Sequence, residues 1–358
     1  MSQPRPAELA ERLLQGDRRA LARVLSLLED GGAAARELAS LLYSHGGRAY
    51  VVGVTGAPGT GKSTLVNTLA RAYRERGSTV GILAVDPTSP FTGGALLGDR
   101  VRMRDLAGDP GVFIRSTATR GGSGGLPRVA ADIVHALDAA GFERIFIETV
   151  GAGQDEVEVA RLAHTVIVVD SPGLGDEIQA IKAGILEIAH ILVVNKADRE
   201  GAEQTLTALR LMLELAAPAG GGVSHHGQAM AVAGVEAAPA GRWQPPVLPT
   251  VATEAQGTAA VLEAIEAHRA HLDASGERAG VEAQRAQAQL SRALDEALRQ
   301  VLAERLDGET YQVALAEVMG RQADPHTVAR RLVEWLRQTA GRPAKGGRDG
   351  GSILRGRE

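Results

Sequence analysis

Hydrophobic positions near the start of the chain recur at helical spacing. Leucines and valines lie three or four residues apart between about Pro6 and Ser44, in groups that Gly16-Asp17 and Gly31-Gly32 separate. Apolar residues at this spacing cover one face of a helix, and glycines commonly end helices. The pattern predicts short packing helices in this region.

From Ala49 onward the pattern changes to short, nearly continuous apolar runs that alternate with amphipathic stretches. Seven runs predict strands, at Tyr50–Thr55, Val80–Val85, Val112–Ile114, Arg144–Glu148, Val166–Asp170, Ile191–Asn195 and Val247–Val251. Strands that are apolar at nearly every position are buried on both faces, as in a parallel sheet covered by helices on both sides. The predicted fold class is α/β, with a doubly wound, mostly parallel sheet.

The rest of the pattern divides the chain further. The stretch from Ala217 to Pro246 is rich in Gly, Ala and Pro without a clear period, which predicts a surface insertion. After Gly257 the spacing of apolar residues becomes helical again. The predicted domains are an N-terminal helical segment at 1–47, a core at 48–272 with a variable insertion at 217–241, a C-terminal helical region at 273–340 and a flexible basic tail at 341–358.

Composition narrows the function classes. The chain has no cysteine, which excludes disulfides, thiolate zinc sites and cysteine nucleophiles and fits a reducing compartment. The formal net charge of -4 gives no long-range attraction to nucleic acid or to an anionic membrane, so neither is an expected partner. The start of the chain does not resemble a signal peptide, and no run of about 18 apolar residues predicts a membrane span. We expect a cytoplasmic protein.

A glycine-rich segment directly follows the first predicted strand and directly precedes an amphipathic stretch. Its residues fit the phosphate-loop pattern G-x-x-x-x-G-K-[ST] in full and are Gly56, Ala57, Pro58, Gly59, Thr60, Gly61, Lys62 and Ser63. Glycines are needed there because backbone N–H groups must turn inward around the phosphates. We expect Lys62 to bridge the β- and γ-phosphates and Ser63 to ligate Mg²⁺, with the next residue, Thr64, also in the binding segment.

A second pattern, N-K-x-D, lies at the end of the sixth predicted strand and comprises Asn195, Lys196 and Asp198. Its Asp carboxylate accepts hydrogen bonds from guanine N1–H and N2–H₂, while the Lys stem packs over the ring. Adenine lacks this donor pair and would leave the carboxylate unpaired, at a cost of about 1–3 kcal/mol or more. The pattern therefore favours GTP over ATP. Val251 and Ala252, at the end of the next strand, are the expected second wall of the base pocket.

Acidic residues at other positions are candidates for holding Mg²⁺ and sensing the γ-phosphate. Asp86 ends the second predicted strand, where ligands bind in open α/β sheets, although a turn before a proline also explains it. Glu148 begins a segment similar to the D-x-x-G switch, in which Gly151 would offer its N–H to the γ-phosphate. Asp99 is a candidate Mg²⁺ ligand or a solvated loop carboxylate. Gln154 either orients water or begins a helix.

Taken together, these segments resemble the MeaB/ArgK family of metallochaperone GTPases, the chaperones of adenosylcobalamin-dependent acyl-CoA mutases. The resemblance covers roughly residues 6 to 335. It rests on a joint set of segments, which are the phosphate loop, Val85-Asp86-Pro87-Thr88-Ser89-Pro90, Gly98-Asp99-Arg100, Glu148-Thr149-Val150-Gly151-Ala152-Gly153-Gln154, Asp170-Ser171-Pro172-Gly173-Leu174-Gly175-Asp176-Glu177-Ile178-Gln179 and Asn195-Lys196-Ala197-Asp198.

The resemblance implies a fold and a function. Family members are homodimers with short N-terminal helices, a GTPase core of the signal-recognition-particle/MinD class and a C-terminal helical dimerisation arm. They bind methylmalonyl-CoA mutase or a related mutase, and GTP binding and hydrolysis gate the loading of cofactor and the removal of damaged cofactor. For this chain the resemblance implies Mg²⁺ and GTP or GDP as ligands, and no cobalamin bound by the chain itself.

The resemblance also assigns roles to single residues. It gives Asp86, Asp99 and Glu148 to Mg²⁺ and the switches, and places Lys182 in a third switch that contacts the partner and supports hydrolysis. Without the resemblance, Lys182 is an ordinary surface lysine. The expected catalytic residues are Lys62, Asp86, Glu148 and Lys182, and the expected metal ligands are Ser63, Asp86, Asp99 and Glu148. The long stretch at 217–241 and the tail at 341–358 depart from the usual family pattern.

Other functions compete with this one. A nickel-insertion GTPase of the same class would need a Cys/His metal site, and a P-loop kinase would transfer the γ-phosphate to a small molecule. A membrane-transport ATPase is opposed by the guanine-type loop and by the lack of apolar spans. A cobalamin-binding mutase is suggested by the near match of Asp324-Pro325-His326-Thr327-Val328-Ala329 to D-x-H-x-x-G, but an Asp N-cap before a helix explains that segment better.

Overall fold

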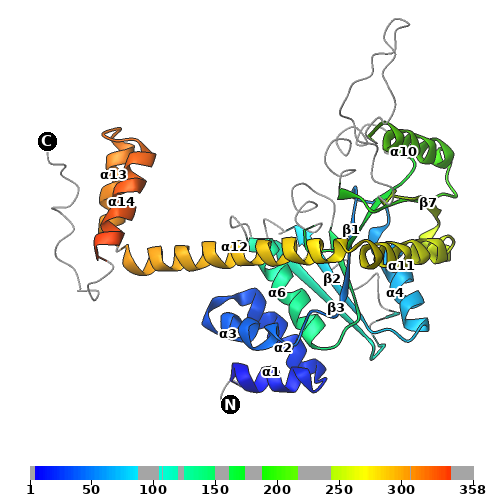
Figure 1. Cartoon of the computed structure of the whole chain (residues 1–358), viewed down its shortest axis with the longest axis horizontal. Coiled ribbons are helices and arrows are strands. Elements are labelled where there is room, and N and C mark those ends of the chain that lie inside the picture. Colours follow the sequence, from blue (N-terminus) through cyan, green and yellow to red (C-terminus); the bar gives the residue numbers. More distant parts are fainter. Residues whose placement is uncertain are drawn as a thin grey trace, which may run out of the picture. The chain divides into compact units, whose positions relative to one another are not determined.

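A computed structural model gives the fold of the chain (Figure 1). The structure describes residues 5–87, 105–106, 108–119, 125–149, 161–173, 188–216, 243–306 and 308–339, and only the backbone at 86–87, 118–119, 125–128, 216, 309 and 339. The predicted insertion at 217–241 and the predicted tail at 341–358 lie outside the described residues.

A seven-stranded parallel sheet forms the centre of the fold, in the order β3-β2-β4-β1-β5-β6-β7. Its strands are β1 (Tyr50–Thr55), β2 (Val80–Pro87), β3 (Val112–Thr119), β4 (Arg144–Thr149), β5 (Thr165–Asp170), β6 (Ile191–Asn195) and β7 (Val247–Thr250). β2, β3 and β4 lie on one side of β1, and β5, β6 and β7 lie on the other, so the sheet is doubly wound. The predicted α/β fold class is confirmed.

Helices account for most of the remaining described chain. They are α1 (Pro6–Leu14), α2 (Arg18–Asp30), α3 (Gly32–Tyr43), α4 (Lys62–Glu75), α6 (Gly125–Ala139), α10 (Ala202–Ala216), α11 (Thr258–Ser275), α12 (Glu277–Arg305), α13 (Gly308–Met319) and α14 (Pro325–Thr339), with a 3-10 turn, η1, at Ala252–Glu254. The three short N-terminal helices agree with the leucine spacing. The side chain of Asp17 caps α2 by accepting from two backbone N–H groups, and Gly31, at φ 74°, ends that helix.

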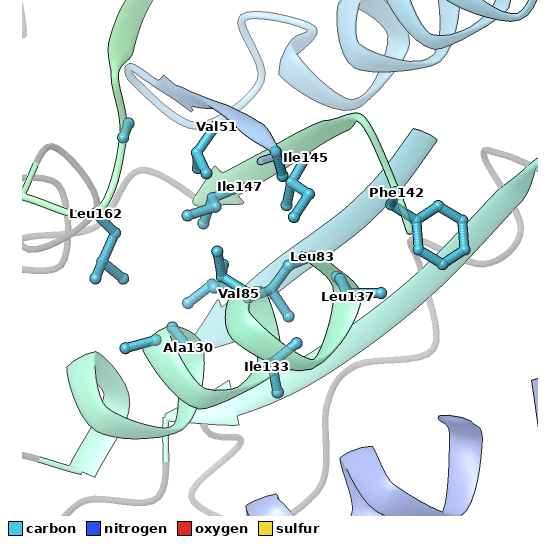
Figure 2. Close-up of a cluster of buried hydrophobic side chains, with 14 of the residues drawn as sticks. Val51, Leu83, Val85, Ala130, Ile133, Leu137, Phe142, Ile145, Ile147 and Leu162 are labelled. Atoms are coloured by element: carbon cyan, nitrogen blue, oxygen red, sulfur yellow. The ribbon is translucent and has the colours of Figure 1, made fainter. Parts of the chain in front are cut away.

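Alternate side chains of each strand point to opposite faces of the sheet, so the core has two halves. On one face Leu83 and Val85 of β2 lie against α6, and the same cluster continues into α1–α3 and α10. Figure 2 shows Ala130, Ile133 and Leu137 of α6 in one cluster with these side chains. On the other face the intervening residues of the strands pack against α4 and α11. Helices on both faces explain why every residue of β1 is buried.

The N-terminal helices are attached to the sheet by arginines as well as by apolar packing. Arg18 of α2 donates to the carbonyls of Pro110 and Val112, at 2.6 Å each. Arg115, on the edge strand β3, forms an ion pair with Glu29 of α2. These contacts and the apolar packing on α6 place the helices in the same compact unit as the sheet.

The chain divides into two compact units, Met1–Ala288 and Gln289–Glu358. The helix α12 runs from the first unit into the second. Within the second unit, α14 begins as expected from an Asp N-cap, because Asp324 Oδ1 accepts from the N–H groups of His326 and Thr327, at 3.0 Å each. No helix in the described part of the chain has the length and apolar character needed to cross a membrane.

Candidate functional site

The glycine-rich segment connects the carboxyl end of β1 with the first turn of α4. The strand ends at Thr55, the helix begins at Lys62, and Gly61 lies at the helix N-cap with φ 94°. Backbone N–H groups at the start of a helix have no partner within the helix and attract anions. The sequence therefore places the predicted phosphate loop where the fold can bind phosphate.

Two glycines of this loop are required by space as well as by conformation. Gly56 has φ 133°, and a side chain there would overlap the backbone carbonyl of Val169 in β5. A side chain at Gly61 would overlap the amide of Asn195. By contrast, a Cβ at Gly59, at φ 79°, would have nothing within 4 Å. The loop therefore packs closely against β5 at Gly56 and against the end of β6 at Gly61.

Lys62 and Ser63 lie at the start of α4, and both are buried. The Lys62 ammonium donates to the carbonyls of Gly56 and Ala57, at 2.7 and 2.9 Å, and so lies across the loop. The Ser63 hydroxyl donates to the carboxylate of Glu148, at the carboxyl end of β4. The fold thus brings together two residues that the sequence separates by 85 positions, and both were predicted metal ligands.

The predicted base-recognition segment is hydrogen-bonded directly to the phosphate loop. The side chain of Asn195 is buried at the end of β6, and its Nδ2 donates to the Thr60 carbonyl at 2.8 Å. The Lys196 ammonium donates to the Gly59 carbonyl at 2.6 Å. Lys196 has φ 56°, a backbone conformation that non-glycine residues rarely adopt and that is often found at functional sites. Asp198 is exposed.

The loop after β7 completes this arrangement. Asn195 Oδ1 accepts from the Thr250 hydroxyl at 3.1 Å and from the backbone N–H of Ala252 at 3.0 Å. The N–H of Ala197 donates to the Thr250 carbonyl, also at 3.0 Å. One asparagine side chain therefore links the phosphate loop, the end of β6 and the loop that contains Val251 and Ala252, the predicted second wall of the base pocket.

The residues present fit a Mg²⁺–nucleotide ligand. The hydroxyl of Ser63 and the carboxylate of Glu148 are hard oxygen donors, the type that Mg²⁺ prefers. The backbone N–H groups at the start of α4, directly after Gly61, are donors of the kind that bind phosphate. These two observations concern different parts of the ligand and agree with each other.

Several predicted residues cannot be placed in this site. Asp86 lies in the last part of β2, but the structure describes only its backbone. Asp99, Gly151, Gln154 and Lys182 lie outside the described residues. Their roles stay predictions.

The structure adds polar residues that were not singled out from the sequence. Thr149 at the end of β4 donates to Thr55 at the end of β1, at 3.1 Å between hydroxyl oxygens, and both are buried. Asp170 ends β5, next to β1, and burial raises the pKa of its carboxyl group. A polar residue at the carboxyl end of a strand was the available signal, since that is where ligands bind in such sheets.

Comparisons with known proteins agree with this geometry. Residues 21–307 match the family "Methylmalonyl Co-A mutase-associated GTPase MeaB". A GTPase-family protein of Pyrococcus horikoshii is 41% identical, over 91% of this chain and 97% of its own length. The GTPase ArgK of Escherichia coli is 33% identical, over 92% and 96% respectively. A crystal structure named as a LAO/AO transport system kinase is 28% identical, with a TM-score of 0.64, over 94% of this chain and 99% of that one.

The match to the family spans most of the chain and includes the phosphate loop, Glu148 and the N-K-x-D segment. Relatives that carry the name GTPase align with nearly the whole chain. The chain is therefore a P-loop GTPase that belongs to the methylmalonyl-CoA mutase-associated GTPase MeaB family.

Proposed function

We propose that this protein binds GTP with Mg²⁺, hydrolyses it to GDP and phosphate, and uses this cycle as a metallochaperone for an adenosylcobalamin-dependent acyl-CoA mutase. The observation that carries the proposal is the Asn195 side chain, which joins a phosphate loop to a guanine-type recognition loop. The predicted base-binding and phosphate-binding loops are thus hydrogen-bonded to each other. This connection suits a GTPase that must recognise the guanine base and the phosphates together.

The chemistry follows from the groups that surround the loop. Mg²⁺, when bound, neutralises charge on the β- and γ-phosphates. Ser63 and Glu148 would hold it, Glu148 through a bound water. Lys62 would exchange its hydrogen bonds to the Gly56 and Ala57 carbonyls for phosphate oxygens. The backbone N–H groups at the start of α4 would stabilise the charge that develops during transfer to water.

Basal hydrolysis is expected to be slow. No general base or arginine finger is assigned among the described residues of this site. The phosphate-loop groups position the phosphates and neutralise their charge rather than activate water. Asp86, Asp99, Gly151 and Lys182 are proposed to complete the site as switch residues. Stimulation by a partner that orders such segments is the expected mode of control.

The proposed partner is methylmalonyl-CoA mutase or a related acyl-CoA mutase. The name of the family associates its members with methylmalonyl-CoA mutase. A mutase client would supply the cobalamin site, so we propose that this chain binds no cobalamin itself. The protein is proposed to act in the cytoplasm, without nucleic acid or membrane as a partner.

We further propose a homodimer formed through the C-terminal helices. The helix α12 has no buried residue, and it presents exposed leucines one turn apart at Leu290, Leu294 and Leu298. Leu290 is 72% exposed. Leucines at this spacing form one apolar stripe, which a second helix from another copy would cover.

The first test of the proposal is nucleotide binding by Lys62→Ala, measured by titration calorimetry in the presence of Mg²⁺. We expect the loss of tight GTP binding, since the β- and γ-phosphates lose their ammonium partner. Arg76→Ala, which removes one positive charge just after α4, is the matched control and should bind as the natural chain does. Equal GTP affinity in Lys62→Ala and the control would refute the site.

A second test addresses the base. Asp198→Asn should bind GTP more weakly and discriminate less against XTP, because an amide can donate to the xanthine carbonyl that replaces the guanine amino group. Glu200→Gln, an exposed neighbour, is the control. An unchanged ratio of GTP to XTP affinity in Asp198→Asn would contradict the base pocket. A pull-down of purified mutase that depends on GTP would then test the partner.

The P-loop kinase remains the competing function, and the products of the reaction distinguish it. Hydrolysis releases one inorganic phosphate for each GTP consumed, whereas a kinase transfers the phosphate to an acceptor. We expect equal amounts of GDP and free phosphate with no added acceptor. A requirement for a small-molecule acceptor, with a phosphorylated product, would favour the kinase.

A further inference from the structure

A buried histidine connects the sheet with the long helix α12, at the end of the sheet opposite the phosphate loop. His164 directly precedes β5, and its side chain is fully buried. Its backbone N–H donates to the Val51 carbonyl at 2.8 Å, and its Nδ1 accepts from the Val51 N–H at 2.9 Å. The ring stacks on Tyr50, with centroids 4.9 Å apart. His164 is thus fixed to the beginning of β1.

The other ring nitrogen faces α12. His164 Nε2 lies 2.6 Å from Glu282 Oε1. Because Nδ1 accepts from a backbone N–H, it carries no proton, and the proton of the neutral ring is on Nε2. The neutral ring therefore donates to Glu282. Burial lowers the pKa of His164, which favours this neutral form at neutral pH.

Arg285, one turn further along α12, completes the contact. Its Nη1 lies 3.1 Å from both carboxylate oxygens of Glu282 and 2.6 Å from His164 Nε2. A guanidinium has only donors, so its favourable partner here is the Glu282 carboxylate. The His164 hydrogen bond and the Arg285 ion pair outweigh the effect of burial, which raises the pKa, and hold the pKa of Glu282 at about 2, well below its usual range. The carboxylate therefore stays charged.

Polar contacts are especially important for holding α12 in place, because none of its residues is buried in the core. Other helices, such as α4 and α11, are held by buried apolar side chains. The first compact unit ends at Ala288, just after Arg285. The polar contact therefore lies on the last part of α12 that belongs to the unit with the sheet.

We propose that His164, Glu282 and Arg285 form a clasp that fixes the first turns of α12 to the GTPase sheet where β1 and β5 begin. The clasp gives the part of α12 that belongs to the first unit a defined attachment to the sheet. His164 is also hydrogen-bonded to Val51, so the clasp attaches α12 to β1, the strand that leads to the phosphate loop. This inference is independent of nucleotide chemistry and of the proposed partner.

Hydrogen–deuterium exchange on the full chain at neutral pH tests the clasp. In Glu282→Ala, the amides of residues 277–288 should exchange at least about tenfold faster than in the natural chain, which corresponds to opening eased by about 1.4 kcal/mol. Alanine has the highest helix propensity, so faster exchange cannot come from a weaker intrinsic helix. Asp295→Ala, which removes an exposed carboxylate from the same helix, is the control and should leave these amides unchanged.

A second variant separates the ion pair from the hydrogen bond. Arg285→Met keeps an apolar stem of similar length and should also speed exchange at 277–288, by less than Glu282→Ala, because the His164–Glu282 bond remains. In every variant the amides of α4 should exchange as in the natural chain, which shows that the sheet is intact. Exchange at 277–288 within twofold of the natural rate in Glu282→Ala would overturn the clasp. The readout needs no nucleotide, so its failure is distinct from failure of GTP binding.

Discussion

Replacing Asn195 by alanine tests whether one side chain connects the two halves of the nucleotide site. The change removes its hydrogen bonds to the Thr60 carbonyl, the Ala252 N–H and the Thr250 hydroxyl. The hydroxyl can rotate to another acceptor, but the two backbone groups are fixed. Each buried backbone group left unsatisfied costs about 1–3 kcal/mol. With some compensation by entering water, we expect the free energy of unfolding to fall by about 2–4 kcal/mol.

Tryptophan fluorescence in urea provides the measurement. The chain has two tryptophans, and Trp243 packs against His268 in the first unit while Trp335 lies in α14. In a Trp335→Phe background, Trp243 alone reports on unfolding of the unit with the sheet. At an m-value of about 2–3 kcal/mol/M, the loss corresponds to a midpoint lower by about 1 M urea.

The control for this prediction is Asn67→Ala in α4. In the described part of the chain, Asn67 Nδ2 donates to Asp105 at the surface, at 3.2 Å to each carboxylate oxygen. The change Asn67→Ala should cost less than about 1 kcal/mol. GTP affinity should also fall at least about tenfold in Asn195→Ala and little in the control. A midpoint shift below about 0.3 M in Asn195→Ala, equal to that of Asn67→Ala, would refute the reasoning.

Three further predictions concern backbone strain and buried histidines. Gly56→Ala should abolish GTP binding in calorimetry, because its Cβ would overlap the Val169 carbonyl. Gly59→Ala, also at positive φ but in open space, should lower the free energy of unfolding measured in urea by only about 1–2 kcal/mol. Ala255→Gly should raise the free energy of unfolding by about 0.5–1 kcal/mol, because Ala255 has φ 56°, which glycine adopts without strain. Ala267→Gly, within α11, should lower it by a similar amount. A change of the same sign in both variants would contradict this reasoning. Burial lowers the pKa of His190 to about 4 and of His268 to about 3. The unfolded chain then binds more protons, so stability should fall from about pH 6.5 toward pH 4, by about 1–2 kcal/mol for each histidine near pH 5, and His268→Gln should flatten the profile.

The sheet was largely predictable because its signal is local. Runs of apolar residues gave β1 and β6 with their observed ends, since both strands are buried throughout. The edge strand β3 was predicted to end at Ile114 but continues to Thr119. Its next residue, Arg115, looks like a loop residue in the sequence. Its partner, Glu29, is 86 positions away, so only the tertiary structure explains how a charge fits in this strand.

The site was predictable where a motif fixes the spacing. The phosphate loop and the N-K-x-D segment each contain their own signal, and the fold brings both to the carboxyl ends of neighbouring strands. The contact between Ser63 and Glu148 followed from assigning both to one metal. By contrast, His164 has no sequence signal. Its role depends on the first residues of β1 and on α12, and nothing in the local pattern around position 164 specifies either partner.

Polar groups at the two ends of the strands make different kinds of contact. At the carboxyl ends, Glu148 and Asn195 connect the strands to the phosphate loop, and we expect their contacts to affect nucleotide binding. At the amino ends, His164 and His190 each accept a backbone N–H of the neighbouring strand, at 2.9 and 3.0 Å. The strands between these two ends are hydrogen-bonded to their neighbours and buried, as β1 and β5 are, and separate the amino ends from the nucleotide site. Substitutions at the amino ends should therefore change stability and the attachment of α11 and α12 while leaving the preference for guanine intact.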